Sequence, residues 1–142
     1  MKSITISIVV CFFIFASGLS AFGEEWEQTI TLSNGDVILD MNGEWATSVE
    51  HYGPWSRFGV FPDISEIKQE GASFVVTTLL GSPRSPKGTE KIKGELEKNG
   101  FKKAQALTGA GLIDLQGKIL ENGDKIIFDD GEKLRIMLIR RK

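Results

Sequence analysis

The chain has almost no cysteine or histidine. Cys11 is its one cysteine and His51 its one histidine. A lone histidine with no cysteine nearby cannot supply the ligands of a transition-metal site. We therefore expect no metal and no cofactor. A single cysteine also excludes a disulfide within the chain, so the folded part must be held together by its core.

The chain also lacks the local patterns of common catalytic sites. No serine lies in a Gly-x-Ser-x-Gly elbow that would present a nucleophile. Asp114 and Asp124 form no evident acid–base pair. The stretch DDGEK, residues 129–133, has too few regularly spaced oxygen ligands for a calcium loop, and it predicts a hairpin turn instead. We expect that the protein is not an enzyme.

No charge of one sign dominates the chain. It has 17 Lys and Arg against 19 Asp and Glu, with a formal net charge of −2. A nucleic-acid-binding protein needs a basic run or stripe, and none is present. This charge balance excludes nucleic acid as the expected partner.

Only one long apolar run is present, and it lies at the N-terminus. Lys2 precedes the run ITISIVVCFFIFASGLSAFG, which ends in small residues. One positive charge, an apolar core and a small-residue end are typical of a secretory signal peptide, here residues 1–23, cut after Gly23 or else after Ala21. The run is short for a membrane span. A retained anchor and lipid attachment at Cys11 are the less favoured alternatives.

We expect residues 24–142 to form one exported domain, either periplasmic or secreted. We also expect the protein to be bacterial. We expect no stable membrane span after signal cleavage. The length suits a single domain that buries its own core without disulfides.

Helical periodicity is almost absent from residues 24–142. Short alternating runs are separated by turn residues, a pattern that predicts an all-β domain. Asn-Gly pairs at positions 34–35, 99–100 and 122–123 supply the positive φ of tight hairpin turns. The first of these pairs predicts an N-terminal β-hairpin ahead of a longer strand that begins at Gly43.

Two hairpins repeat each other, and their spacing predicts the topology. GELEKNGFKK from Gly94 aligns without a gap with GKILENGDKI from Gly117, 23 residues later. Strands of about 11 residues with their turns are typical of an antiparallel up-and-down meander. We predict about eight strands from Gly43 onward. Interior glycines indicate bending or a close backbone approach, and the alternative is a tolerated weak point on an open sheet.

The last predicted strand, LRIMLIR, is apolar on both faces. An open sheet would leave it as an edge that invites aggregation. We therefore predict that the sheet closes into a barrel in which this strand is paired on both sides.

One tryptophan marks the start of the first long strand. Gly43, Trp45 and Thr47 share one phase, so Trp45 is predicted to point inward. Gly43-Glu44-Trp45 resembles the G-x-W signature of lipocalins and the wider calycin group of small β-barrels. That resemblance implies an arginine on the last strand covering the tryptophan at the closed base, and Arg140 matches by phase, with Arg135 as second choice.

The resemblance leaves the narrower family open. The chain is shorter than full lipocalins, and it has neither their cysteine pair nor room for their C-terminal helix. Avidin-like barrels and small bacterial barrel inhibitors of proteases have a similar length and strand number.

The segment HYGPWSRFGVFPD, residues 51–63, is an aromatic loop. It contains Tyr52, Trp55, Phe58 and Phe61. Loops of this length are usually functional or disordered, and the aromatic content argues against disorder. Three roles stay open, namely a lid over the barrel mouth, a protein-binding patch, and a small core that caps the barrel.

The barrel interior is the other candidate site. By strand phase the inward side chains are Ile67, Phe74, Val76, Thr78, Ile92, Leu96, Ala104, Ala106, Leu115, Ile119, Ile126, Phe128, Ile136 and Leu138. The expected function is binding of a small apolar, lipid-like ligand in this interior, with Phe74, Val76 and Phe128 lining the site and the aromatic loop at its entrance. The alternative is a filled barrel that acts as a protein-interaction or inhibitor module through its loops.

Overall fold

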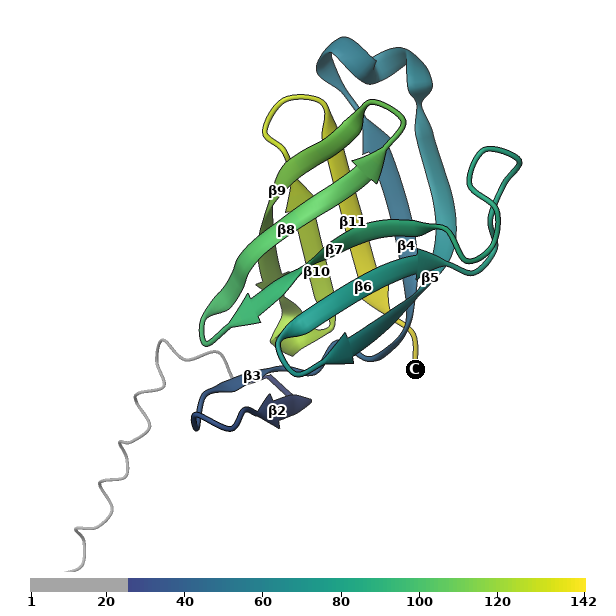
Figure 1. Cartoon of the computed structure of the whole chain (residues 1–142). Coiled ribbons are helices and arrows are strands. Elements are labelled where there is room, and N and C mark those ends of the chain that lie inside the picture. The colour runs from purple at the N-terminus through teal and green to yellow at the C-terminus, as the bar shows by residue number, and fades with distance from the viewer. Residues whose placement is uncertain (1–25) are drawn as a thin grey trace, which may run out of the picture.

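The computed structural model describes residues 26–142, and the signal peptide predicted for residues 1–23 lies outside them. The described chain is almost entirely β-strand, as predicted (Figure 1). Its elements in order are β2 (Thr29–Thr31), β3 (Val37–Leu39), β4 (Gly43–His51), the 3-10 helix η2 (Gly53–Phe58), β5 (Val60–Glu70), β6 (Ser73–Thr78), β7 (Glu90–Glu97), β8 (Gly100–Thr108), β9 (Gly111–Leu120), the 3-10 turn η3 (Glu121–Gly123), β10 (Lys125–Asp129) and β11 (Leu134–Arg140). None of the helices in this part of the chain has the length and apolar character needed to cross a membrane.

Strands β4 to β11 form a closed antiparallel barrel. Each strand pairs with the next along the chain, and β11 returns to pair with β4. The closing register places Leu134 opposite His51 and Arg140 opposite Trp45. The predicted eight-stranded up-and-down barrel is therefore confirmed, and the last strand is paired on both sides.

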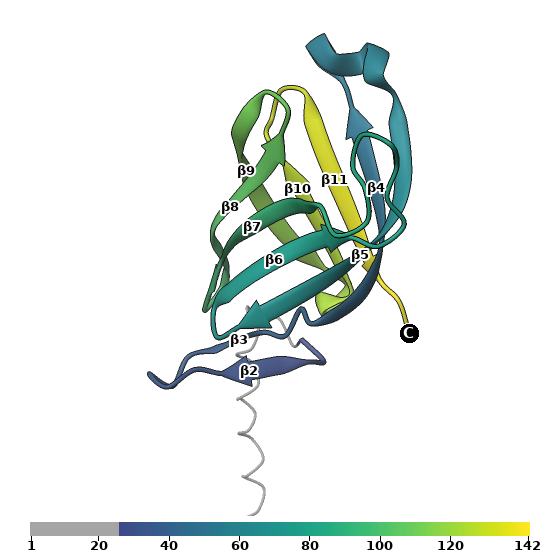
Figure 2. The same ribbon diagram turned by 45° about the vertical axis from the view of Figure 1, so that its right-hand side comes forward.

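The hairpin β2–β3 is a separate two-stranded sheet that lies across one end of the barrel (Figures 1 and 2). Ile38, Leu39 and Met41 are fully buried against the barrel strands. Gln69 of β5 holds the hairpin in place, because its side-chain oxygen accepts from the Met41 N–H at 2.7 Å and its amide donates to the Leu39 carbonyl at 2.9 Å. We call this end of the barrel the base and the opposite end, where η2 lies, the mouth.

Three phenylalanine rings pack together inside the barrel. The ring centroids of Phe101 and Phe128 are 4.9 Å apart, and those of Phe74 and Phe128 are 6.2 Å apart. An added Cβ at Gly117 would lie 2.4 Å from the Phe101 ring and 2.8 Å from the Phe128 ring. At Gly94 it would lie 2.2 Å from the Lys103 carbonyl oxygen of the neighbouring strand and 3.0 Å from the Phe74 ring. At both positions neighbouring atoms lie too close for a residue with a side chain, so glycine is required there.

A polar layer lies between these rings and the mouth. Asp63 of β5 forms an ion pair with Lys91 of β7 and accepts a hydrogen bond from Thr78, and both charged side chains are largely buried. Lys91 reaches Asp63 from an irregularity in the β6–β7 register, where Val76 pairs with Ile92 but the next residue pairs with Glu90. Such a bulge redirects one side chain relative to its neighbours.

The structure corrects the extent of the aromatic loop. Residues 51–63 were expected to form one connection, but β5 already begins at Val60, and residues 53–58 form a 3-10 helix. Pro54 favours the start of that helix, and Gly59 ends it with φ of 79°. The connection between β4 and β5 is therefore short and ordered.

Candidate functional site

Trp45 occupies the base of the barrel. Its side chain is fully buried, and its indole Nε1 donates a hydrogen bond to the Met41 carbonyl at 2.9 Å. The guanidinium carbon of Arg140 lies 4.4 Å from the centroid of the indole ring. Gly43 begins the strand with φ of 126°, a conformation that favours glycine. These are the three residues for which the resemblance to lipocalins implies a place at the barrel base.

Arg140 is held in place by one ion pair and by two hydrogen bonds to backbone carbonyls. Its side chain is 7% exposed and pairs with Asp124 at 3.0 Å. It also donates to the carbonyls of Asp40 and Gly123 at 2.9 and 3.1 Å. The hydrogen bond from Lys142, opposed by desolvation and supported by Arg140, lowers the pKa of Asp124. The base thus links the hairpin, β4, β11 and the turn after β9 through the hydrogen bonds of Trp45 and Arg140.

A cluster of aromatic rings lies at the mouth around His51. The His51 ring centroid is 6.1 Å from that of Trp55, 5.7 Å from that of Phe58 and 5.8 Å from that of Phe61. His51 Nδ1 lies 2.8 Å from the Gly59 carbonyl, so this nitrogen carries the proton and donates it to the carbonyl oxygen. The ring therefore has a packing role that accounts for the only histidine of the chain.

The segment that carries this cluster is tied to the β10–β11 hairpin. The Tyr52 hydroxyl donates to Asp129 at 2.6 Å, and the Tyr52 N–H donates to the Lys133 carbonyl at 2.9 Å. The hydrogen bond to Asp129 is the main reason that the pKa of Tyr52 rises to about 12. An added Cβ at Gly53 would lie 2.5 Å from the Glu132 carbonyl oxygen, so the two backbones are in close contact.

The DDGEK turn supports the same attachment. Asp130 accepts hydrogen bonds from the backbone N–H groups of Glu132, Lys133 and Leu134 at 2.8 to 3.0 Å. Burial acts to raise the pKa of Asp130, but these donors outweigh it, and the pKa lies well below its usual range. The Lys133 ammonium lies 5.4 Å from the centroid of the Trp55 ring. The predicted hairpin turn thus fixes one side of η2.

The mouth also exposes apolar surface. Phe58 is 36% exposed, Val60 59% and Phe61 54%. Arg57 is exposed beside them, with its guanidinium carbon 4.9 Å from the centroid of the Phe58 ring. Within residues 26–142, Arg57 forms no ion pair. We call Arg57, Phe58, Val60 and Phe61 the mouth patch.

The residues predicted to line a ligand site fall into two separate groups. Trp55, Phe58 and Phe61 surround His51 at the mouth, where Tyr52 is bonded to Asp129. The second group is fully or almost fully buried inside the barrel and consists of Phe74, Val76 and Phe128. The Asp63–Lys91 ion pair lies between the two groups along the barrel.

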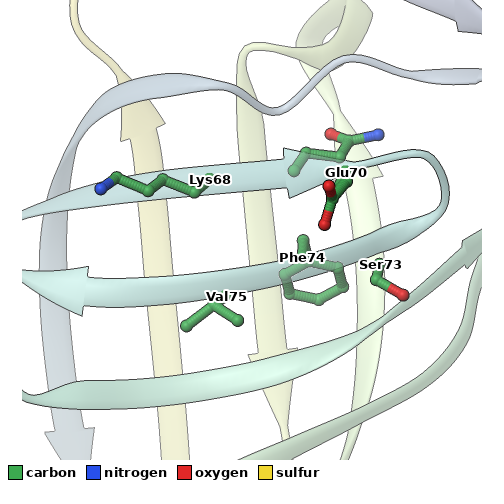
Figure 3. A pocket seen from close by; sticks show the side chains of 6 residues that line it. Lys68, Glu70, Ser73, Phe74 and Val75 are labelled. Carbon is green, nitrogen blue, oxygen red and sulfur yellow. The ribbon is translucent and has the colours of Figure 1, made fainter.

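A hollow of about 400 Å³ lies at the β5–β6 hairpin (Figure 3). Its walls include the charged side chains of Lys68 and Glu70 and the polar side chain of Ser73, with Phe74 and Val75 as apolar surface. The hairpin turn between β5 and β6 is at the base, so the hollow is remote from the mouth patch. Of the residues predicted to line a ligand site, only Phe74 borders this hollow.

Strand phase alone missed three contributors to these regions. Phe101 lies inside the barrel although it is out of phase with Ala104, because the β7–β8 register shifts between Glu95 and Leu96. The inward ion pair of Asp63 and Lys91 depends on a similar irregularity. Residues 26–142 hold no group of His, Cys, Asp and Glu side chains that could bind a metal ion.

The described chain defines a class of protein by its fold, namely a closed eight-stranded antiparallel barrel whose base is covered by a hairpin, compatible with a calycin-like fold. No protein-family model matches the sequence, and no curated protein or solved structure shows significant similarity to it.

Proposed function

We propose that the protein binds another protein through the mouth patch. The observation that carries this proposal is the exposure of Phe58, Val60 and Phe61 near Arg57, which forms no ion pair within residues 26–142, on a segment that Tyr52 ties to the β10–β11 hairpin. Aromatic residues and arginine dominate the binding energy of protein interfaces. Exposed rings on an ordered support therefore fit a recognition surface.

The attachment of η2 favours binding without a large loss of entropy. Tyr52, Gly53 and Trp55 all contact the β10–β11 hairpin, so the loop is already ordered before a partner arrives. A preordered surface binds more tightly because it loses less conformational freedom. The same contacts argue against a freely moving lid.

The chemistry of the patch selects the kind of partner. Phe58 and Phe61 offer apolar ring faces, and Arg57 offers a cation without an acidic neighbour in the described chain. The complementary surface is a peptide segment with an apolar side chain next to a carboxylate. Arg57 would then pair with that carboxylate while the rings bury the apolar side chain.

Selection of displayed peptides tests both parts of this proposal. A random peptide library is selected against the purified protein and, in parallel, against the variants Arg57→Glu and Phe58→Ser. We expect the original protein to enrich peptides with an apolar residue beside Asp or Glu, and Arg57→Glu to reverse the charge preference toward Lys or Arg. Phe58→Ser should abolish enrichment.

Leu112→Ser is the matched control, because Leu112 is 56% exposed on a different hairpin. This control should select the same peptides as the original protein. Peptides whose charge is unaffected by Arg57→Glu would contradict the proposal, and so would an equal loss of enrichment in both serine variants.

A small apolar ligand is the second candidate, and the lipocalin-like geometry of the base favours it. The arrangement of Gly43, Trp45 and Arg140 is the one that the resemblance to lipocalins implies. Phe61 is half exposed although it pairs with Val49 in the inward phase, so the ring stands at the rim of the mouth. The packed phenylalanine rings and the Asp63–Lys91 ion pair argue against a deep apolar cavity.

Native mass spectrometry separates the two candidates. The protein is purified gently after expression of the full chain, and its intact mass is compared with the mass after denaturation. A lipid-sized adduct that is lost on denaturation supports the ligand candidate. A bare mass, together with the charge-dependent peptide selection above, supports the protein-binding candidate.

A further inference from the structure

The outer face of β11 and β4 carries an apolar band. Met137 and Ile139 point outward from β11, because they alternate with the buried Ile136 and Leu138. Ile139 is 45% exposed, although the outer face of a sheet in water is normally polar. The band is separate from the barrel interior, and it adjoins the mouth patch at Val60, which pairs with Glu50.

Within this band, large side chains lie on β11 and small side chains lie on β4. The register places Met137 of β11 opposite Ser48 of β4, and Ile139 opposite Ala46. The outer face therefore has an apolar ridge along β11 and a shallow groove along β4. This arrangement is complementary to itself.

One pair of oppositely charged side chains borders the band at its mouth end, and another borders it at its base end. Toward the mouth, Arg135 of β11 lies opposite Glu50 of β4, with 3.6 Å between the charged groups. Toward the base, Arg141 follows β11 and pairs with Glu44 of β4 at 3.1 Å. Across the two central strands, both rows have the cation on the β11 side and the anion on the β4 side. Arg135 also pairs with Asp129 of the neighbouring β10 at 2.8 Å.

We propose that this face binds a second copy of the chain, related by a two-fold axis that runs along the boundary between β11 and β4. Such an axis places β11 of one copy over β4 of the other and keeps each row facing the same row. Met137 and Ile139 then face Ser48 and Ala46, so that ridge enters groove. A two-fold axis across the strands would instead place ridge on ridge.

The same axis places each arginine opposite a glutamate of the other copy. Arg135 faces Glu50, and Arg141 faces Glu44. One strand further out, Ile127 of β10 and Pro62 of β5 face each other. Two sheets packed face to face with nearly aligned strands are a common arrangement, and a two-fold interface must be complementary to itself in this way.

Sedimentation velocity and light scattering over a range of concentrations provide the first test. The protein from the full chain should form a dimer with a dissociation constant of about 10 μM or tighter, as expected for a modest interface. Ile139→Glu should raise this constant by at least about 30-fold, because it places a carboxylate in the centre of the band. Leu112→Glu, at a comparably exposed site elsewhere, should leave it unchanged.

A charge exchange provides the second and sharper test. Glu44→Arg alone places two arginines opposite each other across the axis, and Arg141→Glu alone places two glutamates there, so both homodimers should weaken. An equal mixture of the two variants restores every opposite-charge contact, and it should dimerise. The exposed Glu44–Arg141 pair within one chain contributes little to folding, so each variant should unfold close to the midpoint of the original protein when all are compared well below the dissociation constant of the dimer.

Several outcomes would overturn the proposal. A monomer at a concentration of about 100 μM would do so, since that is well above the expected dissociation constant. A dimer that Ile139→Glu leaves intact would do so as well, as would a mixture of the charge variants that stays as monomeric as its components. None of these variants changes the mouth patch, so the peptide selection is an independent experiment.

Discussion

Each end of the barrel has an arginine close to an aromatic ring, but the pair at the base is buried and the pair at the mouth is exposed. At the base, the guanidinium carbon of Arg140 lies 4.4 Å from the centroid of the Trp45 ring, and both side chains are buried. At the mouth, that of Arg57 lies 4.9 Å from the centroid of the Phe58 ring, and both residues are exposed. Distance alone does not distinguish the two pairs.

Their surroundings decide what each pair contributes. A cation over an aromatic ring stabilises by about 0.5 to 1 kcal/mol when exposed and by about 2 kcal/mol or more when desolvated. Arg140 is largely buried, and Asp124 and two carbonyls accept hydrogen bonds from it. Arg57 is exposed and forms no ion pair within residues 26–142. The base therefore stabilises the fold, whereas the mouth keeps apolar surface and charge available for a partner.

Replacing Trp45 and Phe58 in turn should give the largest difference in the free energy of unfolding between the two ends. Trp45→Ala should lower the free energy of unfolding by roughly 3 to 5 kcal/mol, because it leaves a cavity at the base and an unpaired Met41 carbonyl. Phe58→Ala should cost less than about 1 kcal/mol, because the ring is partly exposed. Urea denaturation followed by circular dichroism measures both. A loss below about 1 kcal/mol for Trp45→Ala would contradict the structural role of the indole.

Replacing the two arginines should give the next largest difference. Arg140→Ala should cost about 2 to 4 kcal/mol, because Asp124 and the carbonyls of Asp40 and Gly123 lose a buried donor. Arg57→Ala should cost less than about 0.5 kcal/mol, as is usual for a surface charge. The same denaturation experiment applies.

Arg140→Lys is an informative further variant for the base. A lysine keeps the charge but cannot donate to three acceptors with the planar geometry of the guanidinium, so it should recover only part of the loss. Full recovery would show that charge alone matters at the base, and equal losses for Arg140→Ala and Arg57→Ala would remove the distinction between the two ends.

The interior glycines allow a smaller test of how tightly the barrel is filled. Gly117→Ala should cost about 1 to 3 kcal/mol, since the new methyl group would meet the rings of Phe101 and Phe128. Gly109→Ala is the control, because no heavy atom lies within 4 Å of its added Cβ and its φ is not in the left-handed region. Thermal unfolding should separate the two variants. A neutral Gly117→Ala would indicate spare volume beside the rings and would favour the ligand candidate.

Much of the base could be predicted from the sequence. Alternation along a strand predicts that Trp45 points inward. The resemblance to lipocalins implies an arginine of the last strand over this ring, and phase selects Arg140, whose guanidinium carbon lies 4.4 Å from the indole centroid in the structure. Asn-Gly pairs located hairpin turns, because their backbone preference is local. The inward phase of Trp45 and the turns depend only on the period of a strand and on local backbone preference, whereas the partner of Trp45 was expected from the resemblance.

The interior above the base and the mouth could not be predicted in the same way. Phe101 enters the core and Lys91 reaches Asp63 only because the register shifts at two places between neighbouring strands. A register shift reverses the relation between residue number and face, and it depends on pairing with a distant segment. The attachment of Tyr52 to Asp129 likewise joins residues that are 77 positions apart.

The hydrogen bond from Tyr52 to Asp129 leads to the last prediction, which has the smallest expected effect and concerns the mouth alone. Tyr52 is the only tyrosine of the chain, so tyrosinate absorbance reports on it without interference from another site. Its hydrogen bond to Asp129 is the main reason that its pKa rises from 10.0 to about 12. At pH 11, roughly a tenth of the folded protein should carry the tyrosinate, against roughly nine tenths for an unperturbed phenol.

Asp129→Ala should return the midpoint of this titration toward 10, because it removes both the acceptor and the negative charge. Since the pKa is higher in the folded state, the contribution of this hydrogen bond to stability is complete below pH 10 and is lost as the pH rises toward 12. The mouth should therefore loosen in this range, whereas the contacts of Trp45 at the base do not depend on this hydrogen bond. A midpoint near 10 in the original protein would show that η2 is not held at the mouth, and a rigid recognition surface would then have no structural support.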